Sequence, residues 1–280
     1  MNSPLVAQAP AKLNLSLRVL RKREDGFHEI ESTMIRIPGL HDQLTISTSV
    51  EDKFSCDDPS VPSDQSNLVL KAVDAYRAES GFDQNLTIYL EKRIPHGAGL
   101  GGGSSDAATM LTVLNQINDD YLPQAKLIEV AAGLGSDIPF FLGSPTAKVS
   151  GRGESIESVD PPPELPVILL KPSFGVATPD AYGRWKDSTE LPGVSYGSQK
   201  FSWGELANDL ERPVFSKHLF LAEMKVWLLE RPEISGALMS GSGSTMFAVL
   251  RDLDLADRVI RAAKQHLDPT LWSWSGTIGG

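Results

Sequence analysis

The residues best placed to do chemistry form a glycine-rich segment, Gly97-Ala98-Gly99-Leu100-Gly101-Gly102-Gly103, followed by Ser104 and Ser105. Glycine adopts dihedral angles closed to other residues and lets a ligand approach the backbone closely. Ser104, Ser105 and Asp106 are expected to open a helix, whose first amide N–H groups have no partner within the helix. Free amides at the positive end of a helix dipole bind phosphate. The segment therefore predicts a site for a nucleotide or another phosphorylated ligand.

Three other interpretations of this segment are weaker. A Walker A loop requires Gly-Lys-Ser/Thr at the helix start, and no lysine occurs between Arg93 and Lys126. Gly97, Gly99 and Gly102 fit the dinucleotide pattern G-x-G-x-x-G, but the acidic residues that follow fall in a predicted turn rather than at the end of a strand. A flexible linker is disfavoured because apolar residues recur at strand spacing before the segment and at helical spacing after it.

A candidate catalytic lysine lies on a strand near the start of the chain. Over residues 12–19, leucines and a valine alternate with polar side chains, which is the period of a β-strand. Lys12, Asn14 and Ser16 are therefore expected to project from one face. Asp25-Gly26 is predicted to be the turn that ends this strand.

The remaining elements predict an α+β protein, because strands and helices occur without regular βα alternation. The stiff Pro161-Pro162-Pro163 run predicts a boundary between domains over 1–162 and 163–280. Thr178 is expected to cap a helix with Pro179 at its first position. Other helices are predicted over 66–80 (Ser66 as cap, Gly81 as stop), 123–134, 214–229 and 253–267. Strands are predicted around 44–46, 86–90, 167–170, 237–239, 246–250 and 270–274, with a hairpin over 149–159.

Composition excludes several classes of function. A net charge of −10 without a long Lys/Arg run disfavours nucleic-acid binding. No apolar run reaches membrane-spanning length, so no membrane association is expected. The single Cys56 suits a reducing compartment, and we expect a cytoplasmic protein. The five histidines lack metal-ligand spacing, so no protein metal site is expected.

Three separated segments together resemble the GHMP small-molecule kinases. These are 10–15 with Asp25-Gly26-Phe27-His28 after it, Pro95 with Gly99 to Ser105, and Ser240 to Ala248. Residues 12–15 joined to residues 25–28, together with Gly-Ser-Asp-Ile-Pro-Phe-Phe at residues 135–141, narrow the resemblance to one branch of the superfamily. That branch phosphorylates the 2-hydroxyl of a cytidine diphosphate-linked sugar alcohol in non-mevalonate isoprenoid biosynthesis. The resemblance implies a two-domain GHMP kinase fold with the active site between the domains.

The resemblance also implies roles for the reacting groups and for the ATP site. Asp137 matches the catalytic aspartate that takes the proton from the acceptor hydroxyl, although Asp at this position could instead cap a helix. Lys12 matches the catalytic lysine, although it could be an ordinary exposed strand lysine. Ser104 or Ser105 could approach Mg²⁺, and Asn67 could contact adenine or cap a helix. The implied ATP-binding residues are Asn67, Pro95, His96, Gly97, Ala98, Gly99, Leu100, Gly101, Gly102, Gly103, Ser104 and Ser105.

The acceptor side is implied in the same way. Phe27 and Tyr182 fall where the family sandwiches cytosine, and Phe27 retains stacking without a hydroxyl. His28 falls where the family recognises the edge of the base. Thr178 belongs to the same side of the implied substrate site. Tyr182 could instead be a core or surface aromatic residue. The implied substrate-binding residues are Asn14, Phe27, His28, Thr178, Tyr182, Gly241 and Gly243.

The expected ligands are ATP and the nucleotide-linked alcohol, and the expected state is a monomer or weak homodimer. Three alternatives remain: a GHMP kinase acting on mevalonate or homoserine, a nucleotide-binding regulatory protein without turnover, and a dinucleotide oxidoreductase.

Overall fold

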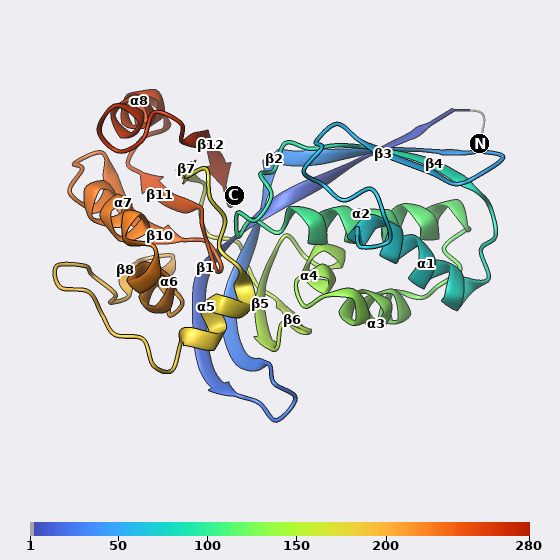
Figure 1. The fold of residues 1–280 in the computed structure, drawn as a ribbon, viewed down its shortest axis with the longest axis horizontal. Coiled ribbons are helices and arrows are strands. Elements are labelled where there is room, and N and C mark those ends of the chain that lie inside the picture. The colour runs from blue at the N-terminus through green and yellow to red at the C-terminus, as the bar shows by residue number, and fades with distance from the viewer. Residues whose placement is uncertain (1–2) are drawn as a thin grey trace.

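Two long antiparallel strands form the spine of the protein, whose computed structural model describes residues 3–280. They are β1 (Leu5–Lys22) and β2 (His28–Thr48), and they are joined by a tight turn in which Gly26 has a φ of 88° (Figure 1). The predicted strand over 12–19 and the turn at Asp25-Gly26 are confirmed.

Among residues 3–280, eight strands build a mixed sheet around this spine. Its main order is β3-β4-β2-β1-β9-β8, and the hairpin β5-β6 joins β2 beyond the end of its pairing with β4. The added strands are β3 (Lys53–Cys56), β4 (Leu86–Glu91), β5 (Thr146–Gly151), β6 (Ser155–Ser158), β8 (Gln199–Phe201) and β9 (Gly204–Asn208). Strand β9 comes late in the chain yet pairs in parallel with β1, so N- and C-terminal segments share one sheet.

Four helices lie together on one side of this sheet (Figure 1). They are α1 (Leu68–Ser80), α2 (Gly102–Ile117), α3 (Gln124–Leu134) and α4 (Ile138–Leu142). Helix α2 is central, because it packs on β1 and β2 and on the other three helices, and buried residues occur all around it. A fixed α2 gives the glycine segment in front of it a rigid support.

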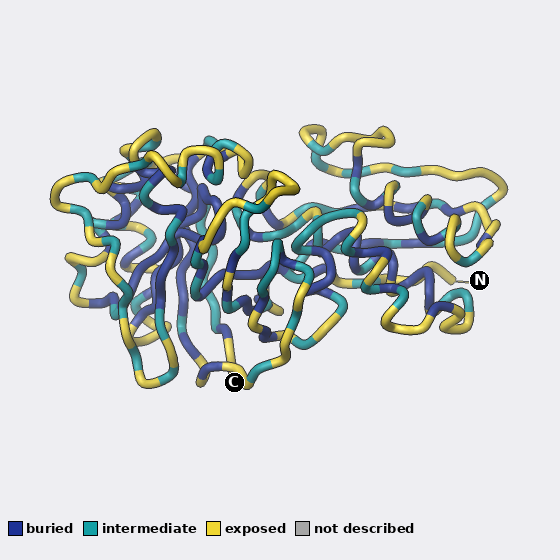
Figure 2. The backbone as a smooth tube through the Cα atoms, turned by 90° about the horizontal axis from the view of Figure 1, so that it is seen from below, coloured by how far each residue is buried: buried dark blue, intermediate teal, exposed yellow. Residues whose placement is uncertain are grey.

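The C-terminal part contains a separate antiparallel sheet with the order β10-β11-β7-β12. Its strands are β7 (Leu165–Lys171), β10 (Ile234–Met239), β11 (Met246–Leu250) and β12 (Trp272–Ile278), which confirms the strands predicted there. The accompanying helices are α5 (Thr178–Arg184), α6 (Glu211–Lys217), α7 (Leu219–Leu229) and α8 (Ala256–His266), with a 3₁₀ turn at Leu253–Leu255. Buried residues are concentrated in the interior of the molecule, while exposed residues lie mainly in peripheral loops (Figure 2).

A β-bulge corrects the prediction that Lys12, Asn14 and Ser16 share a face. Asn14 pairs with Met34, but the next pair is Ser16 with Thr33, so Leu15 has no partner across the strands. The extra residue shifts the side-chain alternation. Lys12 and Asn14 therefore face one cavity, and Ser16 faces another.

Three predicted helix boundaries are wrong. Asn67, not Ser66, caps α1, because its Oδ1 accepts a hydrogen bond from Val69 N–H at 2.8 Å. Helix α2 begins at Gly102, because Gly101 (φ 71°) forms its cap without any side chain. The helix predicted over 214–229 is two helices, because His218 leaves helical geometry (φ −117°, ψ 73°) and stacks on Phe174 at 5.2 Å.

The predicted cap at Thr178 is also wrong. Ala177 occupies the cap position of α5, and Thr178 is the first helical residue. The Thr178 hydroxyl instead hydrogen-bonds the hydroxyl of Ser242 at 2.9 Å. Across residues 3–280, no helix is both long and apolar enough to cross a membrane. The domain boundary at Pro161–Pro163 lies between β6 and β7 and stays a prediction.

Candidate active site

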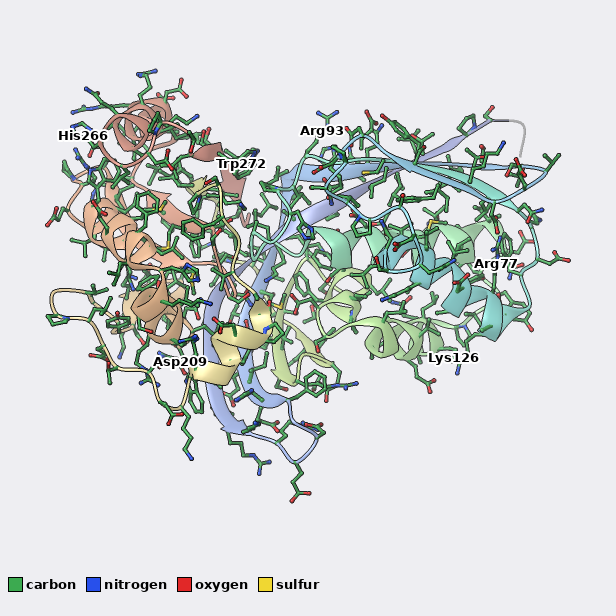
Figure 3. All side chains as sticks on the ribbon, viewed as in Figure 1. Arg77, Arg93, Lys126, Asp209, His266 and Trp272 are labelled. Carbon is green, nitrogen blue, oxygen red and sulfur yellow. The ribbon has the colours of Figure 1, made fainter. Side chains whose placement is uncertain are left out.

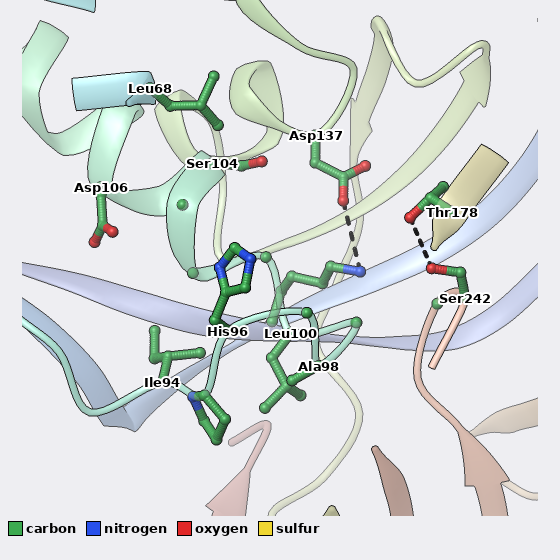
Figure 4. A pocket seen from close by; sticks show the side chains of 18 of the residues that line it. Leu68, Ile94, His96, Ala98, Leu100, Ser104, Asp106, Asp137, Thr178 and Ser242 are labelled. Carbon is green, nitrogen blue, oxygen red and sulfur yellow. Dashed lines mark hydrogen bonds and ion pairs between the residues drawn. The ribbon is translucent and has the colours of Figure 1, made fainter. Parts of the chain in front are cut away.

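The glycine-rich segment lines a cleft of about 390 Å³ where several separated parts of the chain meet. They include β1, the 61–68 segment, the 94–104 segment, Asp137 before α4, helix α5 and the turn between β10 and β11 (Figure 4). All the predicted ATP-binding residues except Ser105 line this cleft, and so do Lys12, Asn14, Asp137, Thr178, Tyr182, Gly241 and Gly243. The structure thus brings together residues from both ends of the sequence.

Backbone hydrogen bonds hold the glycine-rich segment from two sides. Lys12 N–H donates to Leu100 O at 2.9 Å, and Thr245 N–H donates to Ala98 O at 3.1 Å. The Ser240 hydroxyl donates to Gly99 O at 3.0 Å. Gly99 needs to be glycine, because a Cβ there would lie 2.2 Å from the carbonyl oxygen of Ser240. The turn between β10 and β11 is therefore packed directly against the glycine-rich segment.

The start of α2 presents unpaired amides to the cleft. The first helical bond runs from Ser105 N–H to Gly101 O at 2.8 Å, so the amides of Gly102, Gly103 and Ser104 precede it. The Gly101 cap has no side chain that could occupy them. Unpaired amides at the positive end of a helix dipole can bind phosphate oxygens.

Lys12 and Asp137 face each other in the cleft, with Lys12 Nζ 3.6 Å from Asp137 Oδ2 (Figure 4). The lysine side chain is only 4% exposed, whereas the aspartate side chain is 42% exposed. Asp137 occupies the cap position of α4, but its side chain makes no capping hydrogen bond. The carboxylate is therefore free to meet a ligand in the cleft.

The electrostatic environment of Lys12 contains two opposing effects. Burial lowers the pKa of the Lys12 ammonium below its ordinary value, and the charge and hydrogen bonding of Asp137 partly offset that lowering. Asn14 Oδ1 also accepts a hydrogen bond from Lys12 Nζ at 2.6 Å. Nearby, burial and the Asp137 charge raise the pKa of the Tyr182 hydroxyl, which keeps it protonated.

The structure bears on two residues of the predicted ATP site: which of Ser104 and Ser105 faces the cleft, and whether Asn67 caps a helix. Ser104 lines the cleft, whereas Ser105 is fully buried and its hydroxyl has no partner among the described residues. Asn67 lines the cleft, but its amide caps α1 and also donates to Pro62 O at 2.6 Å. Capping therefore already occupies much of the Asn67 hydrogen-bonding capacity.

The predicted aromatic residues are only partly brought together. The His28 ring lies 5.2 Å from the Tyr182 ring and 6.0 Å from the Trp185 ring. The Phe27 ring is 48% exposed and lies under the Arg152 guanidinium at 5.2 Å. Tyr182 lines the cleft, whereas Phe27 lies in the β1–β2 turn and contacts Arg152 of the β5–β6 turn.

Sequence reasoning missed a residue that holds the turn between β10 and β11. Asn208, at the end of β9, donates both amide hydrogens, to Met239 O at 2.7 Å and Gly241 O at 2.8 Å. The adjacent Asp209, labelled in Figure 3, accepts a hydrogen bond from Val19 N–H at 2.9 Å and pairs with Arg18. These contacts fasten β9 to β1. The signal that could have identified Asn208 was its place between a predominantly buried strand and the start of a helix.

A buried charge cluster beside the glycine segment was also missed. Lys92 Nζ contacts Asp42 and lies 2.8 Å from Asp106 Oδ2, and all three side chains are buried. Asp42 Oδ1 also accepts from Ile94 N–H at 2.8 Å. Burial raises the pKa of Asp106 to about 7, although the Lys92 charge opposes this. The cluster ties β2 and the 92–94 segment to the first turns of α2.

The chain is similar to two GHMP kinase families and to named kinases. Residues 67–144 match the family described as GHMP kinases N terminal domain, and residues 200–268 match GHMP kinases C terminal. The 4-diphosphocytidyl-2-C-methyl-D-erythritol kinase of Protochlamydia amoebophila is 40% identical over 86% of this chain and 83% of its own length. The enzyme of that name from Methylacidiphilum infernorum is 40% identical over 94% and 93%.

Solved structures agree with these sequence matches. A crystal structure of 4-(cytidine 5'-diphospho)-2C-methyl-D-erythritol kinase superimposes with a TM-score of 0.80 and 33% identity, covering 99% of this chain and all of that one. Homoserine kinase from Cytophaga hutchinsonii superimposes with a TM-score of 0.65 at 17% identity, covering 99% and 95%. The second likeness concerns the fold alone.

Proposed function

The chain belongs to the 4-diphosphocytidyl-2-C-methyl-D-erythritol kinase family of the GHMP kinases, and we propose how its cleft performs that family's reaction. It is an ATP-dependent small-molecule kinase that phosphorylates the 2-hydroxyl of 4-diphosphocytidyl-2-C-methyl-D-erythritol in non-mevalonate isoprenoid precursor biosynthesis. The products are ADP and the corresponding 2-phosphate.

The observation that carries the assignment of roles is the Lys12–Asp137 pair beside the glycine-rich segment. Asp137 accepts the proton of the 2-hydroxyl as the oxygen attacks the γ-phosphorus of ATP. Lys12, held at the floor of the cleft, stabilises the negative charge that develops on that oxygen. The exposed carboxylate can reach a mobile substrate, while the buried ammonium stays in place.

The triphosphate lies along the amides of Gly102, Gly103 and Ser104, whose free N–H groups match its oxygens. The cleft fits Mg²⁺ through the Ser104 hydroxyl, because this ion usually keeps waters and phosphate oxygens as most of its ligands. The chemistry that Mg²⁺ supplies when bound is neutralisation of phosphate charge. The described residues contain no group of three or more His, Cys, Asp or Glu that could hold a metal ion.

The acceptor side is formed by α5 and the turn between β10 and β11. Tyr182 and Thr178 form one wall, and Gly241 and Gly243 close the other. Cytosine stacks on Tyr182, His28 binds the base edge, and Phe27 closes over the other face after the β1–β2 turn adjusts. A stacked base contributes about 1–3 kcal/mol. Tyr182→Ala should therefore raise the KM for the cytidine substrate at least about fivefold and leave the KM for ATP unchanged.

We further propose two domains over 1–162 and 163–280 and a monomer or weak homodimer. A cytoplasmic location suits the free Cys56, because disulfides are rare in that compartment. The oligomeric state is checked by the solution mass of the purified protein, and the location is checked by cell fractionation.

The test of function is ADP release with Mg-ATP and a panel of alcohols. We expect turnover with 4-diphosphocytidyl-2-C-methyl-D-erythritol, none with mevalonate or homoserine, and competition by CMP. ATP binding without turnover in a single-turnover assay would instead favour a regulatory protein. NAD(P)H binding with no ADP release would favour an oxidoreductase.

A further inference from the structure

The β-bulge in β1 creates a hydrogen-bond chain that ends at Lys12. Because Leu15 has no partner in β2, the Ser16 hydroxyl takes the place of a backbone acceptor and receives Thr33 N–H at 3.0 Å. The Ser16 carbonyl is then free to accept a hydrogen bond from the Ser32 hydroxyl at 2.6 Å. The bulge in the pairing of β1 with β2 thus orients the Ser32 side chain.

The direction of each bond in this chain is determined by the number of available protons. Ser32 has a single hydroxyl proton, which it gives to Ser16 O, so its oxygen can only accept from Asn14. The Asn14 amide nitrogen therefore points to Ser32 at 2.8 Å, and its oxygen points to Lys12 Nζ at 2.6 Å. The reversed amide would direct N–H groups at an ammonium that has no acceptor capacity.

We infer that Ser32 is a positioning residue for phosphoryl transfer, which orients the Asn14 amide so that its oxygen holds the Lys12 ammonium in the cleft. The inference rests on the proposed function of Lys12. Ser32 acts through Asn14, because Ser32 lines a second cavity of about 700 Å³ with Ser16 and Thr33, while Lys12 and Asn14 line the cleft.

Because Lys12 is buried, the hydrogen bond from its ammonium to the Asn14 oxygen matters for keeping it charged and in place. Burial disfavours its charged form, and the groups that face it are the Asp137 carboxylate and the Asn14 oxygen. The neutral Tyr182 hydroxyl lies near Asp137. Losing the correctly oriented Asn14 oxygen removes the closest acceptor of the ammonium, so the Lys12 pKa should fall and the ammonium should become mobile.

The experiment compares Ser32→Ala with Ser32→Thr and with Ser47→Ala. Threonine keeps the hydroxyl and suits a strand, and Ser47 lies on the same strand, in its pairing with β4. We expect Ser32→Ala to lower kcat about tenfold, the size of one lost orienting hydrogen bond. The dissociation constant for ATP should stay unchanged, and the alkaline limb of the pH–kcat profile should move to lower pH. Ser32→Thr should stay within about twofold of wild type, and so should Ser47→Ala.

The inference is overturned if Ser32→Ala keeps the wild-type kcat and pH profile, or if Ser32→Thr is impaired as much as Ser32→Ala. If the alanine variant fails to fold, Ser32→Cys replaces it, because a thiol has a similar shape and bonds only weakly. The positioning role of Ser32 is tested separately from the proposed kinase function by using NMR to monitor the titration of Lys12 in the absence of substrates. A shifted Lys12 pKa in Ser32→Ala supports the positioning role even if the wild-type protein does not turn over the cytidine substrate. An unshifted pKa rejects that role.

Discussion

Lys12 and Asp137 form an unequal pair: the ammonium is buried at the floor of the cleft, and the carboxylate 3.6 Å away is half exposed at the start of α4. Because only the carboxylate is exposed to solvent, this is not an ordinary surface ion pair. In the proposed reaction, an incoming hydroxyl reaches Asp137 while Lys12 keeps its place.

Replacing Asp137 by Asn should remove the proton acceptor and preserve the shape of the cleft. We expect kcat to fall by about 10²–10⁴-fold, the range for general-base catalysis, while the dissociation constant for ATP stays near that of wild type. Steady-state kinetics and ATP titration calorimetry measure the two quantities. Asp83→Asn, an exposed control, should be silent. Full turnover in Asp137→Asn would show that another group accepts the proton.

The pH dependence of turnover should report Lys12. Burial lowers its pKa below the ordinary 10.5, so the ammonium is lost at a lower pH than in an exposed lysine. The kcat should therefore decline as pH rises through a value below 10.5. In Asp137→Asn, the loss of a negative charge should lower the Lys12 pKa further, which NMR titration can follow. A rise in that pKa would contradict the assignment.

Gly99→Ala should push the glycine-rich segment away from the turn between β10 and β11. The new Cβ would lie 2.2 Å from Ser240 O, and Gly99 has a φ of 75°, so both contact and backbone geometry oppose the change. We expect a loss of ATP affinity of at least about tenfold, because a misplaced amide loses its bond to phosphate. Gly133→Ala is the matched control, since it lies in α3 with open space around it. It should stabilise the protein by about 1 kcal/mol.

Lys92→Met should test the buried charge cluster. Removing the ammonium leaves Asp42 and Asp106 buried without their cation, and such losses cost about 3–5 kcal/mol of unfolding free energy. Urea unfolding measures the change. Lys53→Met breaks an exposed pair with Glu51 and should cost at most about 1 kcal/mol. Adding Asp106→Asn to Lys92→Met should recover part of the loss, and equal losses in the two lysine variants would refute this account.

Asn208→Asp should disturb the turn between β10 and β11. The new carboxylate would still accept from Leu210 N–H, but it would face the carbonyls of Met239 and Gly241 instead of donating to them. We expect a loss of about 1–3 kcal/mol in stability and a higher KM for the alcohol substrate. The exposed Asn85→Asp serves as control, because its amide donates to a single carbonyl at the surface. An unchanged KM would mean that Gly241 does not shape the acceptor side.

Local patterns in the sequence were sufficient for most of the secondary structure, including the glycine-rich turn before α2. Alternating residues predicted β1 and β4, and the glycine–serine segment predicted a ligand-binding turn before a helix. These features depend on neighbours along the chain. The errors occurred where a longer-range contact intervened, as at His218, which stacks on Phe174, and at Thr178, which bonds to Ser242.

What the sequence alone determined is the chemistry available: an ammonium, a carboxylate, free amides and aromatic rings on recognisable motifs. Only the tertiary structure decided how they meet. The approach of Lys12 to Asp137, the packing of Gly99 on Ser240 and the bulge that turns Ser32 toward Asn14 each join separate segments. Such contacts depend on sheet register and on close packing of β1 against the glycine-rich turns, which residue spacing along the chain does not specify.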